Sequence, residues 1–189
     1  MRKIVFLNHI SLDGFVAGPN GEMDWIKLPQ ELFDWGNTLT DQADTALYGR
    51  TTYWMMQNYW PTAGNKPNAG KHDKEHSAWY NKVTKVVVSR TMQDTGLEKT
   101  ILIRDHLVQN VKKLKEQPGK NIQMYGSPSV IHELMNADLI DEFYLTVNPI
   151  ILGKGKPLFT NIQHKMKFSL VEAKTFPQGV VLLHYVREK

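Results

Sequence analysis

Short apolar runs alternate along this chain with longer stretches in which apolar residues recur every three to four positions. The runs at 4–10, 45–48, 85–89 and 122–125 consist mainly of β-branched or other apolar residues, which is typical of buried strands. Stretches with helical spacing lie between them. An alternation of strands and helices favours a mostly parallel sheet with helices on both faces, so an α/β fold is expected.

The C-terminal part of the chain has a different pattern. Residues 141–151 form a long predicted strand, and the runs 167–174 and 180–186 flank Pro177-Gln178-Gly179. Two strands joined by such a turn predict a hairpin and an antiparallel edge to the sheet. Because the chain has 189 residues and no repeat, low-complexity tract or linker, residues 1–189 are expected to form one domain.

Two polar segments are predicted to be loops. Residues 11–24 contain the turn sequences Ser-Leu-Asp-Gly and Gly-Pro-Asn-Gly, and residues 61–76 read as a mobile insertion. His72 and His76 have a spacing that is found at metal sites. We find no third ligand for them in the sequence, so a solvated loop without metal is expected. Residues 11–25 and 60–78 are expected to shape any ligand pocket, but their sequences contain no motif that indicates which ligand would bind there.

Composition excludes several classes of protein. The chain has no cysteine, which excludes disulfides and thiolate metal sites and is compatible with the cytoplasm. No apolar run approaches the ~20 residues of a membrane helix. The formal net charge of +4 suits an anionic ligand, but the basic residues are scattered. Lys112, Lys113 and Lys115 fit a solvated helix face, so no nucleic-acid partner is expected. The missing cysteines and the short apolar runs make a cytoplasmic protein without a membrane partner the expectation.

Small and hydrogen-bonding residues follow three of the predicted strands. Each junction, taken alone, is either a helix cap or a phosphate site. The carboxyl ends of parallel strands meet at one edge of a sheet, where ligands bind, so three such junctions together favour a nucleotide site. A Rossmann G-x-G-x-x-G sequence is missing. The junctions are Gly49-Arg50-Thr51-Thr52, Ser89-Arg90-Thr91 and Gly126-Ser127-Pro128-Ser129.

Glu31 and three aspartates, Asp13, Asp24 and Asp34, are candidates for catalysis. Glu31 lies in the first turn of the helix that Pro29 introduces. It is either an exposed acid that complements the helix dipole, which local sequence favours, or a partly buried acid that donates a proton. Asp13 and Asp24 lie in glycine-containing loops, where carboxylates commonly stabilise turns.

Several motifs, spread over nearly the whole chain, carry a resemblance to a known family. In order, they are Ser11-Leu12-Asp13-Gly14, Asp24-Trp25, Tyr48-Gly49-Arg50-Thr51-Thr52-Tyr53, Val88-Ser89-Arg90, Tyr125-Gly126-Ser127, Leu139-Ile140-Asp141-Glu142-Phe143-Tyr144-Leu145, and the run from Asn148 to Phe159. Together they resemble the dihydrofolate reductase-like superfamily. The most similar branch comprises stand-alone bacterial proteins like the C-terminal reductase domain of the riboflavin-biosynthesis deaminase–reductase.

The resemblance implies a three-layer α/β/α fold and NADPH as cofactor. Gly49, Arg50, Thr51 and Thr52 resemble the site for its pyrophosphate and 2′-phosphate. Ser89 and Arg90 match the strand end beside the adenosine phosphate, and Gly126 and Ser127 match the turn near the nicotinamide. Ser127 stands where classical dihydrofolate reductases have a second glycine, and Phe15 stands where riboflavin-pathway domains usually have lysine. The resemblance also implies a homodimer, built in part from the C-terminal strands.

The leading hypothesis is an NADPH-dependent reductase that transfers hydride to a C=N or similar bond of a pterin-like or pyrimidine-like heterocycle. Glu31, if buried, delivers the proton, and Thr146 orients it. The loop from Asp13 to Trp25, which includes Asp24, closes over the nicotinamide, and Trp25 and Phe33 sandwich the substrate ring. The alternative is a nucleotide- or small-ligand-binding protein that keeps the fold without catalysis.

Overall fold

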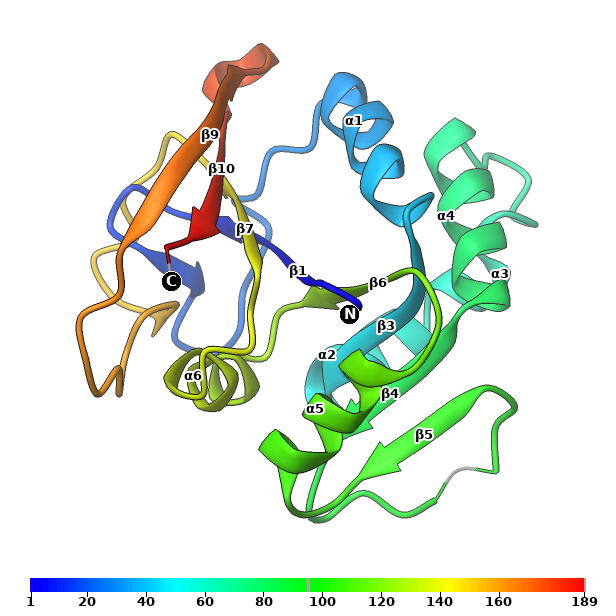
Figure 1. Ribbon diagram of the computed structural model, residues 1–189. Helices are drawn as coiled ribbons and strands as arrows, with labels where there is room; N and C mark the ends of the chain where they lie inside the picture. The colour runs from blue at the N-terminus through cyan, green and yellow to red at the C-terminus, as the bar shows by residue number, and fades with distance from the viewer. Residues whose placement is uncertain (95, 189) are drawn as a thin grey trace.

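An eight-stranded sheet forms the centre of the protein (Figure 1). The structure is a computed structural model that describes residues 1–94 and 96–188. The strand order is β5-β4-β3-β6-β1-β7-β10-β9. The strands of this sheet are β1 (Ile4–Ile10), β3 (Ala43–Gly49), β4 (Thr84–Val88), β5 (Thr100–Ile103), β6 (Asn121–Tyr125), β7 (Glu142–Val147), β9 (Phe168–Thr175) and β10 (Val181–Arg187).

The pairing of the strands confirms the predicted architecture. β1 pairs in parallel with β6 and β7, β3 pairs in parallel with β4 and β6, and β4 pairs in parallel with β5. β10 is antiparallel to both β7 and β9, and the short helix η1 (Pro177–Gly179) connects it to β9. The sheet is therefore mostly parallel, and its antiparallel strands are at the C-terminal edge.

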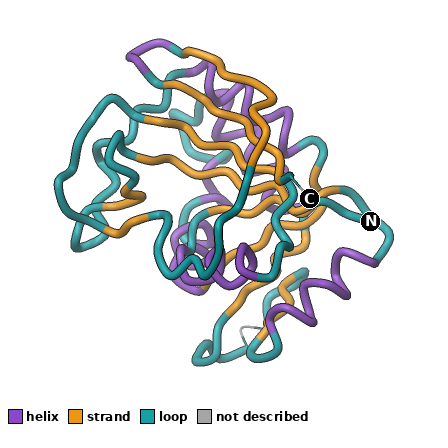
Figure 2. The backbone as a smooth tube through the Cα atoms, turned by 60° about the vertical axis from the view of Figure 1, so that its left-hand side comes forward, coloured by secondary structure: helices purple, strands orange, loops and turns teal. Residues whose placement is uncertain are grey.

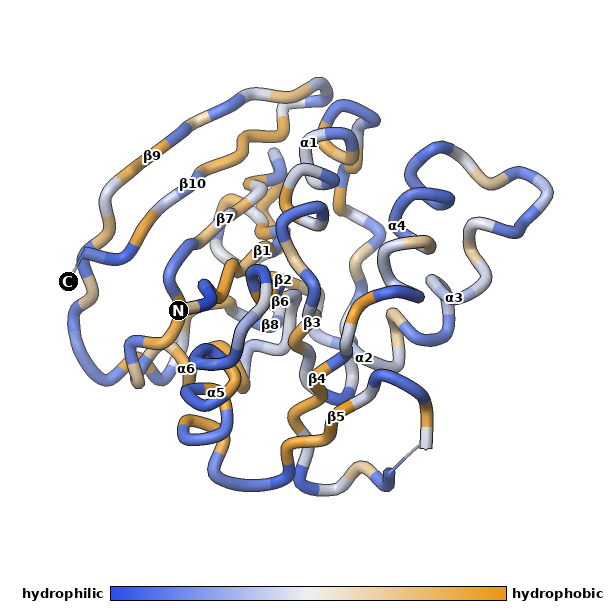
Figure 3. The backbone as a smooth tube through the Cα atoms, turned by 45° about the vertical axis from the view of Figure 1, so that its right-hand side comes forward, coloured by the Kyte–Doolittle hydropathy of each residue, from blue (hydrophilic) through white to orange (hydrophobic). Residues whose placement is uncertain are grey.

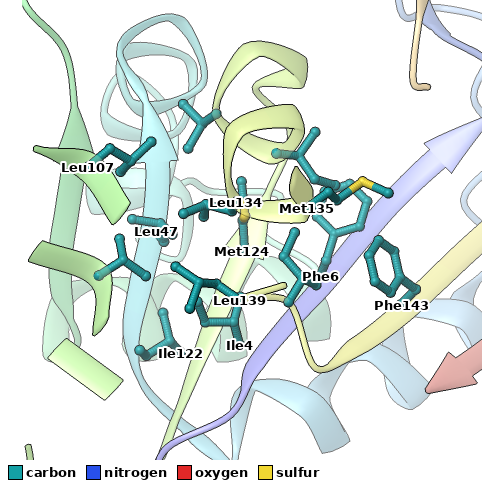
Figure 4. Packing of buried hydrophobic residues seen from close by; sticks show 14 of the residues in the cluster. Ile4, Phe6, Leu47, Leu107, Ile122, Met124, Leu134, Met135, Leu139 and Phe143 are labelled. Carbon is teal, nitrogen blue, oxygen red and sulfur yellow. The ribbon is translucent and has the colours of Figure 1, made fainter. Parts of the chain in front are cut away.

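Helices cover both faces of the sheet (Figure 2). Successive strand residues point to opposite faces, so Ile4 and Phe6 of β1 face one layer and Val5 faces the other. The layer on the Ile4 face contains α5 (Leu107–Glu116) and α6 (Pro128–Asn136). Its apolar side chains interlock with those of the central strands in the largest core cluster (Figure 4).

The opposite layer contains α1 (Gln30–Thr40), α2 (Arg50–Gln57) and α4 (Lys71–Lys82). Leu32 and Leu39 of α1 pack on Val5, and Tyr53 of α2 and Tyr80 of α4 pack on the strands at the other end of the sheet. The result is the expected three-layer α/β/α arrangement. No helix in the described parts of the chain has the length and apolar character needed to cross a membrane.

The polar segment 61–76, expected to be a mobile insertion, contains α3 (Trp60–Ala63) and the first half of α4. Asp73 accepts a hydrogen bond from the Gly70 N–H at 3.1 Å, which fixes the start of α4. Ser77 Oγ donates to the Trp60 carbonyl oxygen at 2.7 Å and joins the two helices. His72 and His76 therefore lie on a packed helix and not in a solvated loop.

Two other expectations about the elements are wrong. The segment 11–24 contains a short strand, β2 (Phe15–Ala17), which pairs with β8 (Lys156–Pro157). The strand expected over 141–151 ends at Val147. Pro149 has no N–H for a continuing ladder, and the side chain of Asn148 bonds outside the sheet, where its Oδ1 accepts a hydrogen bond from Lys27 N–H at 2.7 Å.

Candidate functional site

A cleft of about 920 Å³ lies at the carboxyl ends of the parallel strands, on the side of the sheet that α1, α2 and α4 cover. It is lined by the last residues of β1, β3, β4, β6 and β7, and by parts of these three helices. This is the edge at which ligands bind in open α/β sheets. The cleft therefore contains two of the strand-to-helix junctions that the sequence singles out and part of the third.

Ser127 joins two of these junctions. Its hydroxyl oxygen accepts a hydrogen bond from the Gly49 N–H at 2.8 Å and lies 3.0 Å from Thr52 Oγ1. A side chain at either neighbouring glycine would disturb this contact, since a Cβ on Gly49 would lie 2.7 Å from Ser127 Cβ. A Cβ on Gly126, which has φ +54°, would lie 2.8 Å from Thr52 Oγ1. The serine in place of a second glycine thus holds the two turns together.

The N-termini of α2 and α6 meet at this point. Neither helix has a side-chain cap; Gly49 and Ser127 are their N-cap residues. The first N–H groups of a helix and its dipole favour an anion. Arg50 adds a guanidinium group, which donates to Thr91 Oγ1 at 2.7 Å. These residues fit a phosphorylated ligand, as the residue types at the junctions predict.

The third junction is placed only in part at the cleft. Ser89 lines it, and its hydroxyl oxygen accepts hydrogen bonds from the N–H groups of Thr91 and Met92 at 3.3 and 3.0 Å. Arg90 is exposed and does not line the cleft. Thr91, which the sequence analysis gave no role of its own, lines it and holds Arg50.

Thr146 contacts a histidine and not the expected acid. Its hydroxyl group is hydrogen-bonded to Nδ1 of His9, and both residues line the cleft. Burial lowers the pKa of His9 to about 4, so its imidazole is neutral at pH 7. His9 is therefore a neutral hydrogen-bonding group at the carboxyl end of β1.

Glu31 is exposed and lies outside the cleft, so the expectation of a buried proton donor is wrong. The reason is the orientation of α1. Leu32 and Leu39 face the sheet, whereas Glu31, Asp34 and Thr38 share the exposed side. Glu31 therefore matches the alternative interpretation of an exposed acid in the first helical turn.

The three residues of the 11–25 loop that are predicted to act in the site, Asp13, Asp24 and Trp25, also lie outside the cleft. Asp13 accepts hydrogen bonds from Ser11 Oγ at 2.6 Å and from the N–H groups of Leu152 and Gly153. The Ser11 hydroxyl and these N–H groups lower the pKa of Asp13. Asp24 is exposed, and the Trp25 indole donates to the Glu22 carbonyl oxygen at 3.1 Å. These side chains belong to turns and to the link between two loops, and they lie outside the cleft in which the expected catalytic and substrate contacts would be made.

The charged groups of the cleft are few. Among the described lining residues, Arg50 and Lys156 are the cations, and aspartate and glutamate are absent. The lining therefore favours an anionic ligand near Arg50 but offers no carboxylic acid as a proton donor.

One wall of the cleft is aromatic, and of its residues only Phe33 is predicted from the sequence to contact a ligand. Phe33, predicted to contact substrate, lines the cleft and stacks on His72 with ring centroids 3.8 Å apart. Trp60 lies 4.1 Å from His76, and Tyr125 lies 6.3 Å from it. The i, i+4 spacing of His72 and His76 was the signal available in the sequence.

Comparisons with known proteins agree with this architecture. The family model described as the RibD C-terminal domain matches residues 2–182. The Bacillus subtilis protein YyaP is 36% identical over 187 residues, which cover 97% of this chain and 94% of YyaP.

Solved structures share the fold. A protein from Shewanella sp. PV-4, provisionally named a riboflavin biosynthesis protein, superposes with a TM-score of 0.77 at 25% identity, covering 100% of both chains. Dihydrofolate reductase from Enterococcus faecalis superposes with a TM-score of 0.65 at 16% identity, covering 99% of this chain and 97% of the reductase. The second likeness shows that the fold is dihydrofolate reductase-like. With the family match over nearly its whole length, this chain belongs to the RibD C-terminal domain family.

Proposed function

We propose that this protein is a reductase that uses NADPH to reduce a C=N or similar bond in a small pterin-like or pyrimidine-like heterocycle. The RibD C-terminal domain family and the dihydrofolate reductase-like fold support a reductase-like function. The Enterococcus faecalis reductase of this fold was solved with NADP(H) bound. The cofactor and the substrate class are our proposal for this chain.

One observation carries the cofactor assignment: two uncapped helix N-termini meet beside a guanidinium group. The two turns would hold the pyrophosphate through the N–H and hydroxyl groups of Thr51, Thr52, Gly126 and Ser127, whereas the Gly49 N–H stays bonded to Ser127 Oγ and lets the ligand approach closely.

Arg50, with Thr91 and Ser89 beside it, would bind the 2′-phosphate that distinguishes NADPH from NADH. A guanidinium group suits this role because it binds phosphate through two parallel hydrogen bonds.

NADPH, when bound, supplies the hydride. The residues of this chain orient the acceptor. His9, fixed by Thr146, presents a neutral imidazole to the cleft. Because the described lining has no carboxylate, we assign the proton of the reduction to water and give His9 an orienting role.

The same lack of a carboxylate favours a second candidate function, a binding protein that keeps the cofactor site without turnover. Multiple-turnover oxidation of NADPH, followed at 340 nm with a panel of pterin and pyrimidine acceptors, separates the two. Sustained oxidation with any acceptor supports the reductase. Tight NADPH binding without oxidation supports the binding protein.

Arg50→Gln tests the cofactor assignment directly, because glutamine is of similar polarity but has no charge. Calorimetric titration should show an affinity for NADPH about tenfold lower than that of the unmodified protein. The affinity for NADH should stay unchanged. An equal loss for both coenzymes would remove the 2′-phosphate from the role of Arg50.

A further inference from the structure

The wall of the cleft that α3 and α4 provide contains two histidines with unusual surroundings. Phe33 stacks on His72 at an interplanar angle of 14°, and Trp60 packs on His76. The two imidazole rings lie 5.4 Å apart and both line the cleft. The rings of α1 and α3 thus hold both histidines in place at the cleft surface.

Each imidazole has a nitrogen without a partner. Nε2 of His76 and Nδ1 of His72 are buried and form no hydrogen bond within residues 1–94 and 96–188. His76 is only 7% exposed. Buried polar atoms in folded proteins are nearly always hydrogen-bonded, so two neighbouring exceptions in a cleft indicate a ligand that completes them.

This wall adjoins the proposed cofactor site. Tyr125 lies 6.3 Å from His76 and immediately precedes Gly126 in the turn that Ser127 joins to Gly49. A flat molecule bound against the histidines would therefore lie beside the cofactor turns. A hydride acceptor must lie against the nicotinamide, and the Gly126 turn is the one expected next to that end of the cofactor.

The wall is also uncharged. Burial lowers the pKa of His76 to about 3 and also lowers the pKa of His72, so both rings are neutral at pH 7. The charged neighbours on α1 and α4, including the Asp34–Lys71 pair at 2.9 Å, do not line the cleft. A neutral imidazole offers one donor and one acceptor, which matches the edge of an uncharged nitrogen heterocycle.

A metal ion is a poorer explanation for the pair. A site of this kind needs at least a third ligand, and the described residues contain no cluster of three His, Cys, Asp or Glu side chains. The free nitrogens are therefore assigned to hydrogen bonds.

We propose that His72 and His76 form the substrate-recognition surface of the cleft, and that they bind the hydrogen-bonding edge of an uncharged, planar nitrogen heterocycle. The proposal rests on the proposed function in one respect, that the ring bound there is the hydride acceptor. It makes the α3–α4 segment the part of the chain that determines substrate specificity.

Nuclear magnetic resonance of protein labelled with ¹⁵N in its histidines tests this contact, with pterin as the probe. The ring nitrogen signals of His72 and His76 should shift on titration with pterin. Those of His106 and His164, which are exposed and outside the cleft, should not. Unchanged signals at His72 and His76, or a failure of pterin to bind, would overturn the proposal.

Variants give a second test that separates recognition from packing. His76→Phe keeps a ring of similar size and should lower pterin affinity by about tenfold, with NADPH affinity unchanged. His76→Gln, which restores a hydrogen-bonding group, should recover part of the loss. His164→Phe is the matched control. Full pterin affinity in His76→Phe would contradict the proposal, and the spectra of the unmodified protein decide the matter if this variant does not fold.

Charge discrimination is tested with pterin-6-carboxylate, which differs from pterin by one anionic group. Pterin-6-carboxylate should bind no more tightly than pterin. Tenfold tighter binding would contradict the claim that the surface formed by His72 and His76 is uncharged. NADPH titration without pterin keeps the two proposals distinguishable. Pterin binding without NADPH binding would contradict the proposed cofactor and leave the proposed recognition surface standing. NADPH binding without pterin binding would contradict only the recognition surface.

Discussion

Ser127 is the residue on which the geometry of the cofactor turns depends most. Its backbone has φ +60°, and its hydroxyl group is hydrogen-bonded to the Gly49 N–H and to Thr52 Oγ1. Ser127→Ala removes these bonds and keeps the strained backbone, so the free energy of unfolding should fall by about 1–2 kcal/mol in urea titrations. Ser127→Gly relieves the strain and should lose less. An alanine variant as stable as the unmodified protein would contradict this role.

His9 and His76, both in the lining of the cleft, predict how stability depends on pH. The folded-state pKa values of His9 and His76 are about 4 and about 3, whereas histidine in an unfolded chain has a pKa of about 6.5. Below pH 6.5 the unfolded chain binds protons that the folded protein does not. The free energy of unfolding should therefore fall as the pH drops from 6.5 toward 4, by up to about 1.4 kcal/mol per pH unit for each histidine, with no such effect above pH 7.

Urea titrations of His76→Phe measure the share of this slope that belongs to His76. The variant should lose less stability between pH 6.5 and 4.5 than the unmodified protein does. His164→Phe, which alters an exposed ring, should keep the original slope. Equal slopes for all three proteins would show that His76 is not held neutral.

At the residue scale, the sequence predicts a side chain well where its position along a strand decides its place. Gly49, Arg50, Ser89 and Ser127 follow strands whose ends must meet at one sheet edge, and all four line the cleft. Glu31 was not predictable in the same way. Its exposure depends on which side of α1 faces the sheet. That side is set by the packing of Leu32 and Leu39 against the sheet, which exists only in the folded protein.

At the scale of elements, the central strands are readable because their apolar runs are unbroken, whereas α4 is not. Its residues are mainly hydrophilic (Figure 3). Its buried side consists of His76, Ser77 and Tyr80, which do not form an apolar stripe. β2 and β8 have three and two residues, too few for a periodic pattern.

The turn between β6 and α6 predicts a contrast between two glycines. Gly126→Ala places a Cβ 2.8 Å from Thr52 Oγ1 at a positive φ and should lower the free energy of unfolding by about 1–3 kcal/mol. Gly36→Ala, in α1 with open space around the added Cβ, should raise it by up to about 1 kcal/mol. Thermal and urea denaturation measure both changes. A tolerated alanine at position 126 would show that the turn can relax and does not require glycine.

At the scale of the whole molecule, the C-terminal hairpin provides an exposed sheet edge. β9, orange in Figure 1, is the last strand of the sheet, and its Leu170 and Val171 are 55% and 56% exposed. Apolar edge strands commonly pair with another chain. We propose a homodimer through this edge. Light scattering should give a mass twice that of one chain. The Leu170→Lys variant should give a mass closer to that of a single chain. A monomeric unmodified protein would contradict the proposal.

The central claim is that the strand ends of β3 and β6 form an NADPH site. Backbone amide chemical shifts, recorded while NADPH is added to the ¹⁵N-labelled protein, test it most directly. The largest changes should occur at the amides of residues 49–52, 126, 127, 129 and 130, with saturation at micromolar to millimolar NADPH. No change at these amides, or changes confined to the opposite layer at α5, would contradict the account.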